Sequence, residues 1–159
     1  MGTAVVIFVL ALISLGLAAP PLRTIQAVRA LSPDDAAAAL PIDVEGVVTF
    51  SNTADFGRYG FIQSGDQGIF VFFPGDRPPP PPGHRVRLTG QTDPGEFAPT
   101  IRADGYTSLG EAALPEAAPA SLEQLMTGQL DSRWVQLEGT VRSFGDDPLS
   151  NLQTLLLVS

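Results

Sequence analysis

Cysteine and lysine are both absent from this chain of 159 residues, and histidine occurs once, at His84. Without cysteine the chain can form no disulfide framework and no thiolate zinc site. All nine basic residues are arginines, and 17 acidic residues oppose them, which gives a formal net charge of −8. Because so acidic a chain repels phosphate backbones, its composition disfavours nucleic acid as a partner.

The sequence also lacks the motifs of common catalytic sites. It contains no G-x-S-x-G elbow, no H-E-x-x-H pair and no G-x-x-x-x-G-K loop. A Ser-His-Asp arrangement would have to use His84, which follows a proline-glycine turn and is expected to be an exposed polar side chain. Asp34-Asp35 is expected to be helix-start charge and Asp146-Asp147 a solvated turn, rather than metal ligands. We therefore predict no enzymatic activity, no catalytic residue, no metal site and no cofactor.

The N-terminal segment predicts the compartment. Residues 4–19 are apolar apart from Ser14, and no charge occurs before Arg23. A run of this length lies between a signal-peptide core and a membrane-spanning helix of about 20 residues. We predict that residues 1–21 are a signal peptide or membrane anchor. The protein is then exported to the periplasm or another extracytoplasmic compartment, and both cleavage and retention in the inner membrane remain open.

A hairpin at residues 59–73 is the centre of the predicted fold. Residues 59–64 and 69–73 are rich in aromatic and β-branched side chains, which favour strands. Gly65-Asp66-Gln67-Gly68 between them is expected to form the turn. In the second strand Ile69, Val71 and Phe73 share one face, and Phe70 and Phe72 share the other. Both faces are apolar, so we expect this hairpin to be covered on both sides or to cover another element.

Short helices and further strands surround this hairpin. Helical spacing predicts two short helices in residues 22–41, one capped by Thr24 and one beginning at Ser32-Pro33 and running to Leu40 before Pro41. Alternation predicts strands at 42–50, 84–91 and 99–109, with a loop at 51–56 and a turn at 92–95. The five prolines at 78–82 are expected to form a stiff polyproline II bridge of about 16 Å.

Five strands in one short region predict a closed sheet. We expect residues 42–110 to form a five-stranded OB-like barrel, in which the first strand lies beside the fourth. Asp43 and Glu45 would then face Arg85 and Arg87 across these two strands. The predicted fold class is therefore mainly β, with short N-terminal helices before the barrel.

The pattern begins again after a linker at 111–120. Ser121-Leu-Glu-Gln124 is a capping box before a helix of about seven residues that ends at Gly128. The strand predicted at 134–143 then repeats the Glu-Gly step of the first strand, and a Gly-Asp-Asp-Pro turn and a strand at 152–158 follow. We interpret 121–159 as the start of a second OB-like module, incomplete here, and expect the chain to be a fragment of a longer protein.

Four segments resemble a known family. They are T-I-x-x-V-R-x-L-S-P-x-x-A (24–36), L-P-x-x-V-x-G-V-V-T (40–49), G-F-I-Q-S-G-D-x-G-I-F-V (60–71) and G-H-R-V-R-L-T-G (83–90). This order resembles the repeated OB-like modules outside the membrane in some bacterial sensor histidine kinases and related receptors. Similar runs occur in OB modules attached to secreted nucleases. The resemblance implies the fold and a membrane-bound signalling context; no kinase, transmitter or nuclease segment is present, so neither activity is implied.

The candidate binding residues lie on the outer face of the hairpin. Aromatic rings on this face of an OB barrel can stack on flat rings or sugar faces. The alternative is that these rings pack against the N-terminal helices or the neighbouring module. Two functions follow: a non-catalytic sensory or interaction module that binds a small ligand or protein partner, and an oligonucleotide- or glycan-binding accessory domain of a secreted enzyme. The candidate residues are Tyr59, Phe61, Phe70 and Phe72, with Arg58 and Arg102 as nearby charges.

Overall fold

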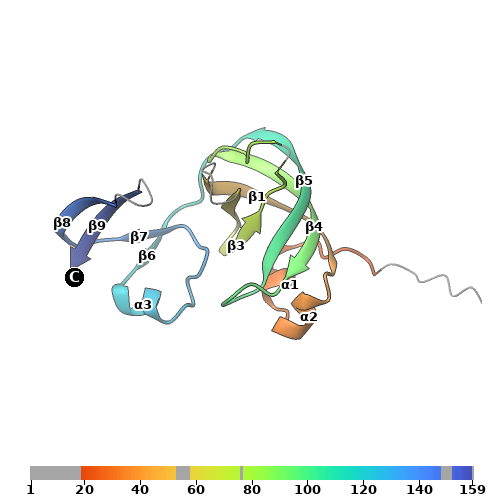
Figure 1. The fold of residues 1–159 in the computed structure, drawn as a ribbon, viewed down its shortest axis with the longest axis horizontal. Coiled ribbons are helices and arrows are strands. Elements are labelled where there is room, and N and C mark those ends of the chain that lie inside the picture. The colour runs from red at the N-terminus through yellow and green to blue at the C-terminus, as the bar shows by residue number, and fades with distance from the viewer. Residues whose placement is uncertain (1–18, 53–57, 76, 148–151, 159) are drawn as a thin grey trace, which may run out of the picture.

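The computed structural model describes residues 19–52, 58–75, 77–147 and 152–158, and in these ranges the chain is mainly β (Figure 1). Almost all of the predicted signal or anchor run at 4–19, and most of the predicted loop at 51–56, lie outside them. Across the described ranges, no helix has both the length and the apolar character needed to cross a membrane.

Five strands pair in the closed order β1-β2-β3-β5-β4. β1 is antiparallel to both β2 and β4, and β3 is parallel to β5 over Val71 and Phe72, opposite Ile101 and Arg102. The predicted five-stranded sheet, with the first strand beside the fourth, is confirmed. The strands are β1 Pro41–Asn52, β2 Tyr59–Ser64, β3 Gln67–Phe72, β4 His84–Asp93 and β5 Thr100–Glu111.

The interior of the barrel is filled by the inward side chains of these strands. Burying aliphatic side chains of this size stabilises the fold by about 1.5–3 kcal/mol each. Val86 and Leu88 of β4 point inward, and both are fully buried. The other strand residues of the core cluster are Ile42, Val44, Val48, Ile62, Ile69, Val71, Ile101 and Ala103.

Two short helices close one end of the barrel, next to β4 in Figure 1. α1, Ile25–Arg29, has the predicted cap, since Thr24 Oγ1 accepts from Ala27 N at 3.1 Å, and its buried Ile25 and Val28 join the core. α2, Pro33–Ala37, is capped by Ser32 as predicted.

α2 is shorter than predicted, because the chain turns at Ala39, whose φ is +54°. A residue before proline disfavours the helical region, so Leu40 before Pro41 cannot extend the helix. Leu40 N instead donates to Thr92 Oγ1 at 2.9 Å, and the buried Thr92 hydroxyl donates to Ala36 O at 2.8 Å. These bonds attach α2 to β4.

The connections differ from the prediction at their ends. The hairpin turn contains only Gly65 and Asp66, because Gln67 and Gly68 pair with β2 and belong to β3. Similarly, β4 continues through Thr92 and Asp93, which were predicted to lie in a turn. Hydrogen bonds to neighbouring strands therefore extend β3 and β4 beyond the apolar residues from which each strand was predicted.

The proline segment links β3 to β4 as predicted, without forming a helix or strand. Pro79 and Pro80 are buried, and Tyr106 donates its hydroxyl to Pro78 O at 2.7 Å. Arg77 lies 3.6 Å from the centroid of the Tyr106 ring. The start of the segment is therefore packed against β5, whereas Pro81 and Pro82 are exposed.

The downstream elements lie beside the barrel in Figure 1. The predicted capping box is present, but the helix it starts has five residues rather than seven. The predicted strand at 134–143 is divided at Glu138-Gly139, because β7 pairs in parallel with β6 whereas β8 pairs with β9. Gly145, Asp146 and Asp147 belong to β8 rather than to a turn, and Pro148 lies outside the described residues. The elements are β6 Ala118–Ala120, α3 Leu122–Met126, β7 Val135–Leu137, β8 Thr140–Asp147 and β9 Leu152–Val158.

The predicted ion pairs between β1 and β4 are confirmed. Arg87 contacts both carboxylate oxygens of Asp43 at 2.6 Å, and Arg85 contacts Glu45 at 2.9 Å. Arg23 also pairs with Asp43. The hydrogen bond and charge of Arg87, and then of Arg23, hold the pKa of Asp43 below its ordinary value of 3.8, against the opposing effect of burial.

The Asp43 ion pairs predict an acid-sensitive component of stability. The pKa of Asp43 is lower in the folded chain, so the pairs stabilise the fold at pH above the ordinary value of 3.8. This stabilisation is lost as the pH falls through the folded pKa. Melting temperatures measured from about pH 5 to pH 2 should therefore fall less for Asp43→Asn than for the wild type. Asp104→Asn, at an exposed position on β5, is the control and should keep the wild-type slope. An unchanged slope for Asp43→Asn would contradict the prediction.

Candidate functional site

The outer side of β1, β2 and β3 carries a cluster of aromatic rings. Side chains alternate along a strand, so the residues next to the buried Ile62 on β2, and next to the buried Ile69 and Val71 on β3, point outward. The register places Tyr59 opposite Phe72 and Phe61 opposite Phe70. We call this surface the aromatic face; its residues are Phe50, Tyr59, Phe61, Phe70 and Phe72.

Phe50 joins the aromatic face through an irregularity in β1. Simple alternation from Val44 and Val48 would turn Phe50 inward, but the register shifts between Val48 and Phe50. Such a bulge reverses the direction of the following side chain. Phe50 is consequently 44% exposed, and its place on this face could not be predicted because alternation alone gives no sign of a bulge.

The rings contact one another continuously across the three strands. Tyr59 stacks on Phe70 with centroids 5.3 Å apart, and Phe61 meets Phe70 edge-on at the same distance. Phe72 lies 4.8 Å from Phe70, and Phe50 lies 6.2 Å from Tyr59 and 6.1 Å from Phe61. The structure therefore brings all four predicted aromatic residues together.

The two predicted arginines differ in their placement. Arg102 lies 5.0 Å from the Phe72 ring centroid and donates to Asp93 at 2.7 Å. Burial raises the pKa of Asp93, but hydrogen bonds from Gly95 N and Arg102 outweigh it, so the pKa lies below its ordinary value. Arg58 is half-buried, and its guanidinium Nη1 is enclosed without a partner among the described residues, so it is not part of the ring cluster.

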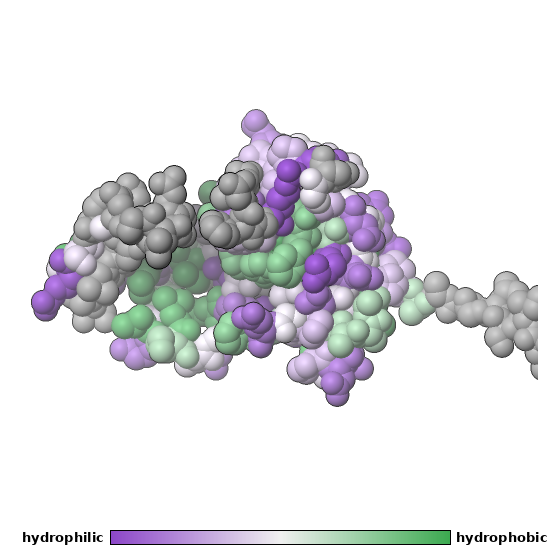
Figure 2. Space-filling model, in the orientation of Figure 1, coloured by the Kyte–Doolittle hydropathy of each residue, from purple (hydrophilic) through white to green (hydrophobic). Residues whose placement is uncertain are grey.

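A groove of about 570 Å³ extends from the aromatic face to the loop between β4 and β5. At the tip of this loop, Phe97 is 96% exposed, although large apolar side chains are normally covered. In Figure 2, apolar surface gathers over the part of the barrel that carries β3. We call this cavity the aromatic groove; it is lined by Phe61, Phe70, Phe72, Asp93, Gly95, Glu96, Phe97, Ala98, Thr100, Arg102, Asp131 and Ser132.

The last two lining residues come from the connection between α3 and β7, which we call the 129–134 segment. Trp134 N donates to the side-chain oxygen of the buried Gln63 at 2.8 Å, and Asp131 pairs with Arg29 of α1 at 2.7 Å. A side chain at Gly68 would overlap the carbonyl oxygen of Ser132, so the segment lies directly on β3. The downstream chain thus forms one wall of the groove.

These contacts bear on the two interpretations of the aromatic residues. α1 inserts Ile25 and Val28 into the core and does not cover the aromatic face. Asp131 and Ser132 of the 129–134 segment line the groove together with Phe61, Phe70 and Phe72. The rings therefore remain partly open.

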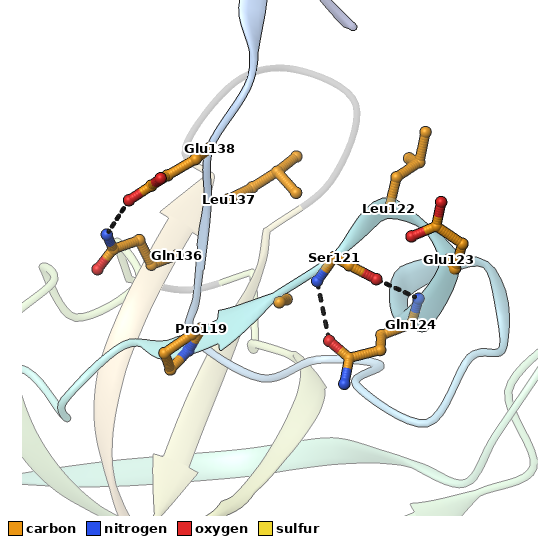
Figure 3. Close-up of a pocket in the computed structure, with 9 residues that line it drawn as sticks. Pro119, Ser121, Leu122, Glu123, Gln124, Gln136, Leu137 and Glu138 are labelled. Atoms are coloured by element: carbon orange, nitrogen blue, oxygen red, sulfur yellow. Dashed lines mark hydrogen bonds between the residues drawn. The ribbon is translucent and has the colours of Figure 1, made fainter. Parts of the chain in front are cut away.

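A second cavity, of about 540 Å³, lies between β6, α3 and β7 (Figure 3). Two of its polar residues pair with each other, because Ser121 N donates to Gln124 Oε1 at 2.8 Å and Gln124 N donates to Ser121 Oγ at 3.3 Å. The aromatic groove is thus the stronger candidate site.

The described residues contain no group of three or more potential metal ligands. His84, which was expected to be exposed, is half-buried on β4.

Comparison with known proteins finds no matching family model and no matching curated protein.

Proposed function

We propose that this chain is a non-catalytic, extracytoplasmic sensory or interaction module of a membrane-bound signalling protein. Its aromatic groove would bind a small ligand or a protein partner. The observation that carries the proposal is the groove itself, in which the nearly fully exposed Phe97 faces open space beside an aromatic floor. Concave sites with apolar walls and a few polar groups are the usual form of a binding site.

An OB-like identity for the barrel is part of this proposal. The strand order β1-β2-β3-β5-β4, with β3 parallel to β5, supports it. OB barrels bind ligands over strands two and three and the loops beside them. The aromatic face and the loop that carries Phe97 occupy the corresponding places here.

A second module after the linker is also proposed, and one structural parallel supports it. Leu22 forms a parallel bridge to Ile42 of β1, and the Thr24-capped helix lies between them. Pro119 of β6 pairs in parallel with Gln136 of β7, and the Ser121-capped helix lies between them. In both cases an extended residue two positions before the cap pairs with the strand that follows the helix.

The second candidate function is an oligonucleotide- or glycan-binding accessory domain of a secreted enzyme. The exposed rings favour it, since bases and sugars stack on aromatic side chains. The negative charge of the groove opposes oligonucleotide binding, because the groove lining contains three carboxylates and one arginine. We therefore prefer the first function.

Binding can be tested by NMR titration of the labelled chain with three probes. These are a pool of heptapeptides, a glucose hexasaccharide and an oligothymidylate of about 12 nucleotides, within the range that one OB fold covers. We expect the peptide pool to shift the amide resonances of the loop that carries Phe97. Phe97→Ala should weaken binding about tenfold, as for an exposed aromatic anchor.

The control is Met126→Ala, since Met126 is also exposed but lies on α3. It should leave binding unchanged. Micromolar binding of oligothymidylate with a steep salt dependence would instead support the accessory-domain function. Shifts by no probe, or shifts confined to surfaces away from the groove, would contradict both.

A further inference from the structure

The aromatic groove has a surplus of negative charge. Its lining includes Asp93, Glu96 and Asp131, and Arg102 is its cation. Arg102 is already paired with Asp93, and Asp131 with Arg29, each at 2.7 Å. Glu96 is exposed and has no partner among the described residues. A groove in an acidic protein with an unpaired carboxylate at its rim attracts cations.

The groove also contains an example of the contact that such a cation would make. The guanidinium of Arg102 lies 5.0 Å from the ring centroid of Phe72 and donates to the Asp93 carboxylate. An aromatic face attracts a cation, and a carboxylate accepts the hydrogen bonds of its N–H groups. Glu96 and Phe97, consecutive in the loop between β4 and β5, offer a second carboxylate and ring, and there no cation of the described chain is bound.

We propose that the aromatic groove binds an arginine-bearing peptide segment of a partner protein. The guanidinium would lie on the Phe97 ring and donate to the Glu96 carboxylate. This rests on the proposed function and assigns the chemistry of its ligand. A planar guanidinium fits this site better than a flexible polyamine, because it can stack on a ring and at the same time donate hydrogen bonds to a carboxylate. The groove volume of about 570 Å³ leaves room for neighbouring peptide residues as well.

The test measures fluorescence anisotropy with the full chain and a labelled hexapeptide that carries two arginines. A matched hexapeptide carries glutamine in place of both arginines. We expect the arginine peptide to bind about tenfold more tightly, the combined effect of cation–π and charge-assisted contacts. Glu96→Gln should weaken it about threefold, since an exposed ion pair is modest. Phe97→Ala should weaken it about tenfold. Glu116→Gln and Met126→Ala, at exposed positions outside the groove, should have no effect.

The outcomes separate this inference from the proposed function. If both peptides bind equally and Phe97→Ala weakens both, the groove is a binding site but selection for arginine is wrong. Spermidine that displaces the arginine peptide at equal concentration would overturn the assignment of a peptide. If neither peptide binds, the inference is overturned. The proposed function still stands in that case if the heptapeptide pool binds in a Phe97-dependent manner.

Discussion

Ile62→Ala is expected to lower the free energy of unfolding by about 2–5 kcal/mol, the range for large-to-small changes in a core. Ile62 is fully buried on β2, between Val48 of β1 and Ile69 of β3. Hydrogen bonds to both neighbouring strands hold the backbone in place, so the cavity cannot collapse easily. Small domains have total stabilities of about 5–15 kcal/mol, and the loss would be a large part of this.

Urea denaturation followed by circular dichroism measures this effect. Ile62→Val removes only one methylene, and we expect a loss of about 0.5–1.5 kcal/mol. Phe97→Ala, at an exposed position, should stay within about 0.5 kcal/mol of the wild type. A loss below about 0.5 kcal/mol for Ile62→Ala would show that this side chain is not enclosed by three paired strands.

Gly68→Ala is expected to release the 129–134 segment from the barrel. The added Cβ would overlap the backbone carbonyl of Ser132, and neither backbone can yield as a flexible side chain can. Separation would break the bond from Trp134 N to Gln63 and leave the buried Gln63 oxygen unsatisfied, at a cost of about 1–3 kcal/mol. Trp134 is the one tryptophan of the chain, so the tryptophan emission comes from this segment alone.

We expect the emission of Trp134 in Gly68→Ala to shift to longer wavelength as the indole gains solvent. Gly75→Ala is the matched control, because a Cβ there would meet no atom within 4 Å and Gly75 has no positive φ. Asp131→Asn should shift the emission in the same direction and less strongly, since it weakens the pair with Arg29 and leaves Gly68 unchanged. Identical emission of Gly68→Ala and the wild type would exclude the contact between β3 and the segment.

The core hairpin and the helix caps could be predicted because their determinants are local. Alternation places Ile69, Val71 and Phe73 on one face, and all three are buried. Thr24 and Ser121 cap helices because each hydroxyl reaches an amide three residues ahead. The strand ends were less predictable, since Gln67, Gly68 and Asp93 enter strands through partners on other elements.

The candidate site could be predicted only in part. Tyr59, Phe61, Phe70 and Phe72 follow from alternation in two adjacent strands, and the structure places their rings in contact. Phe50 required a bulge that no local pattern indicates. Phe97 gave only a weak signal, an aromatic residue in a loop otherwise made of turn-forming, charged and small residues.

The sequence by itself determined which side chains of a regular strand share a face, where the short helices begin and the acidity of the protein. These follow from backbone periodicity, from capping groups within one turn and from composition. Only the tertiary structure decided that Asp93, Phe97 and Arg102 border the same groove as Asp131 and Ser132. Residues so far apart in the chain meet because β5 pairs with both β3 and β4, and because the 129–134 segment returns to Gly68. Contacts of this kind depend on the closed strand order, which no single stretch of sequence encodes.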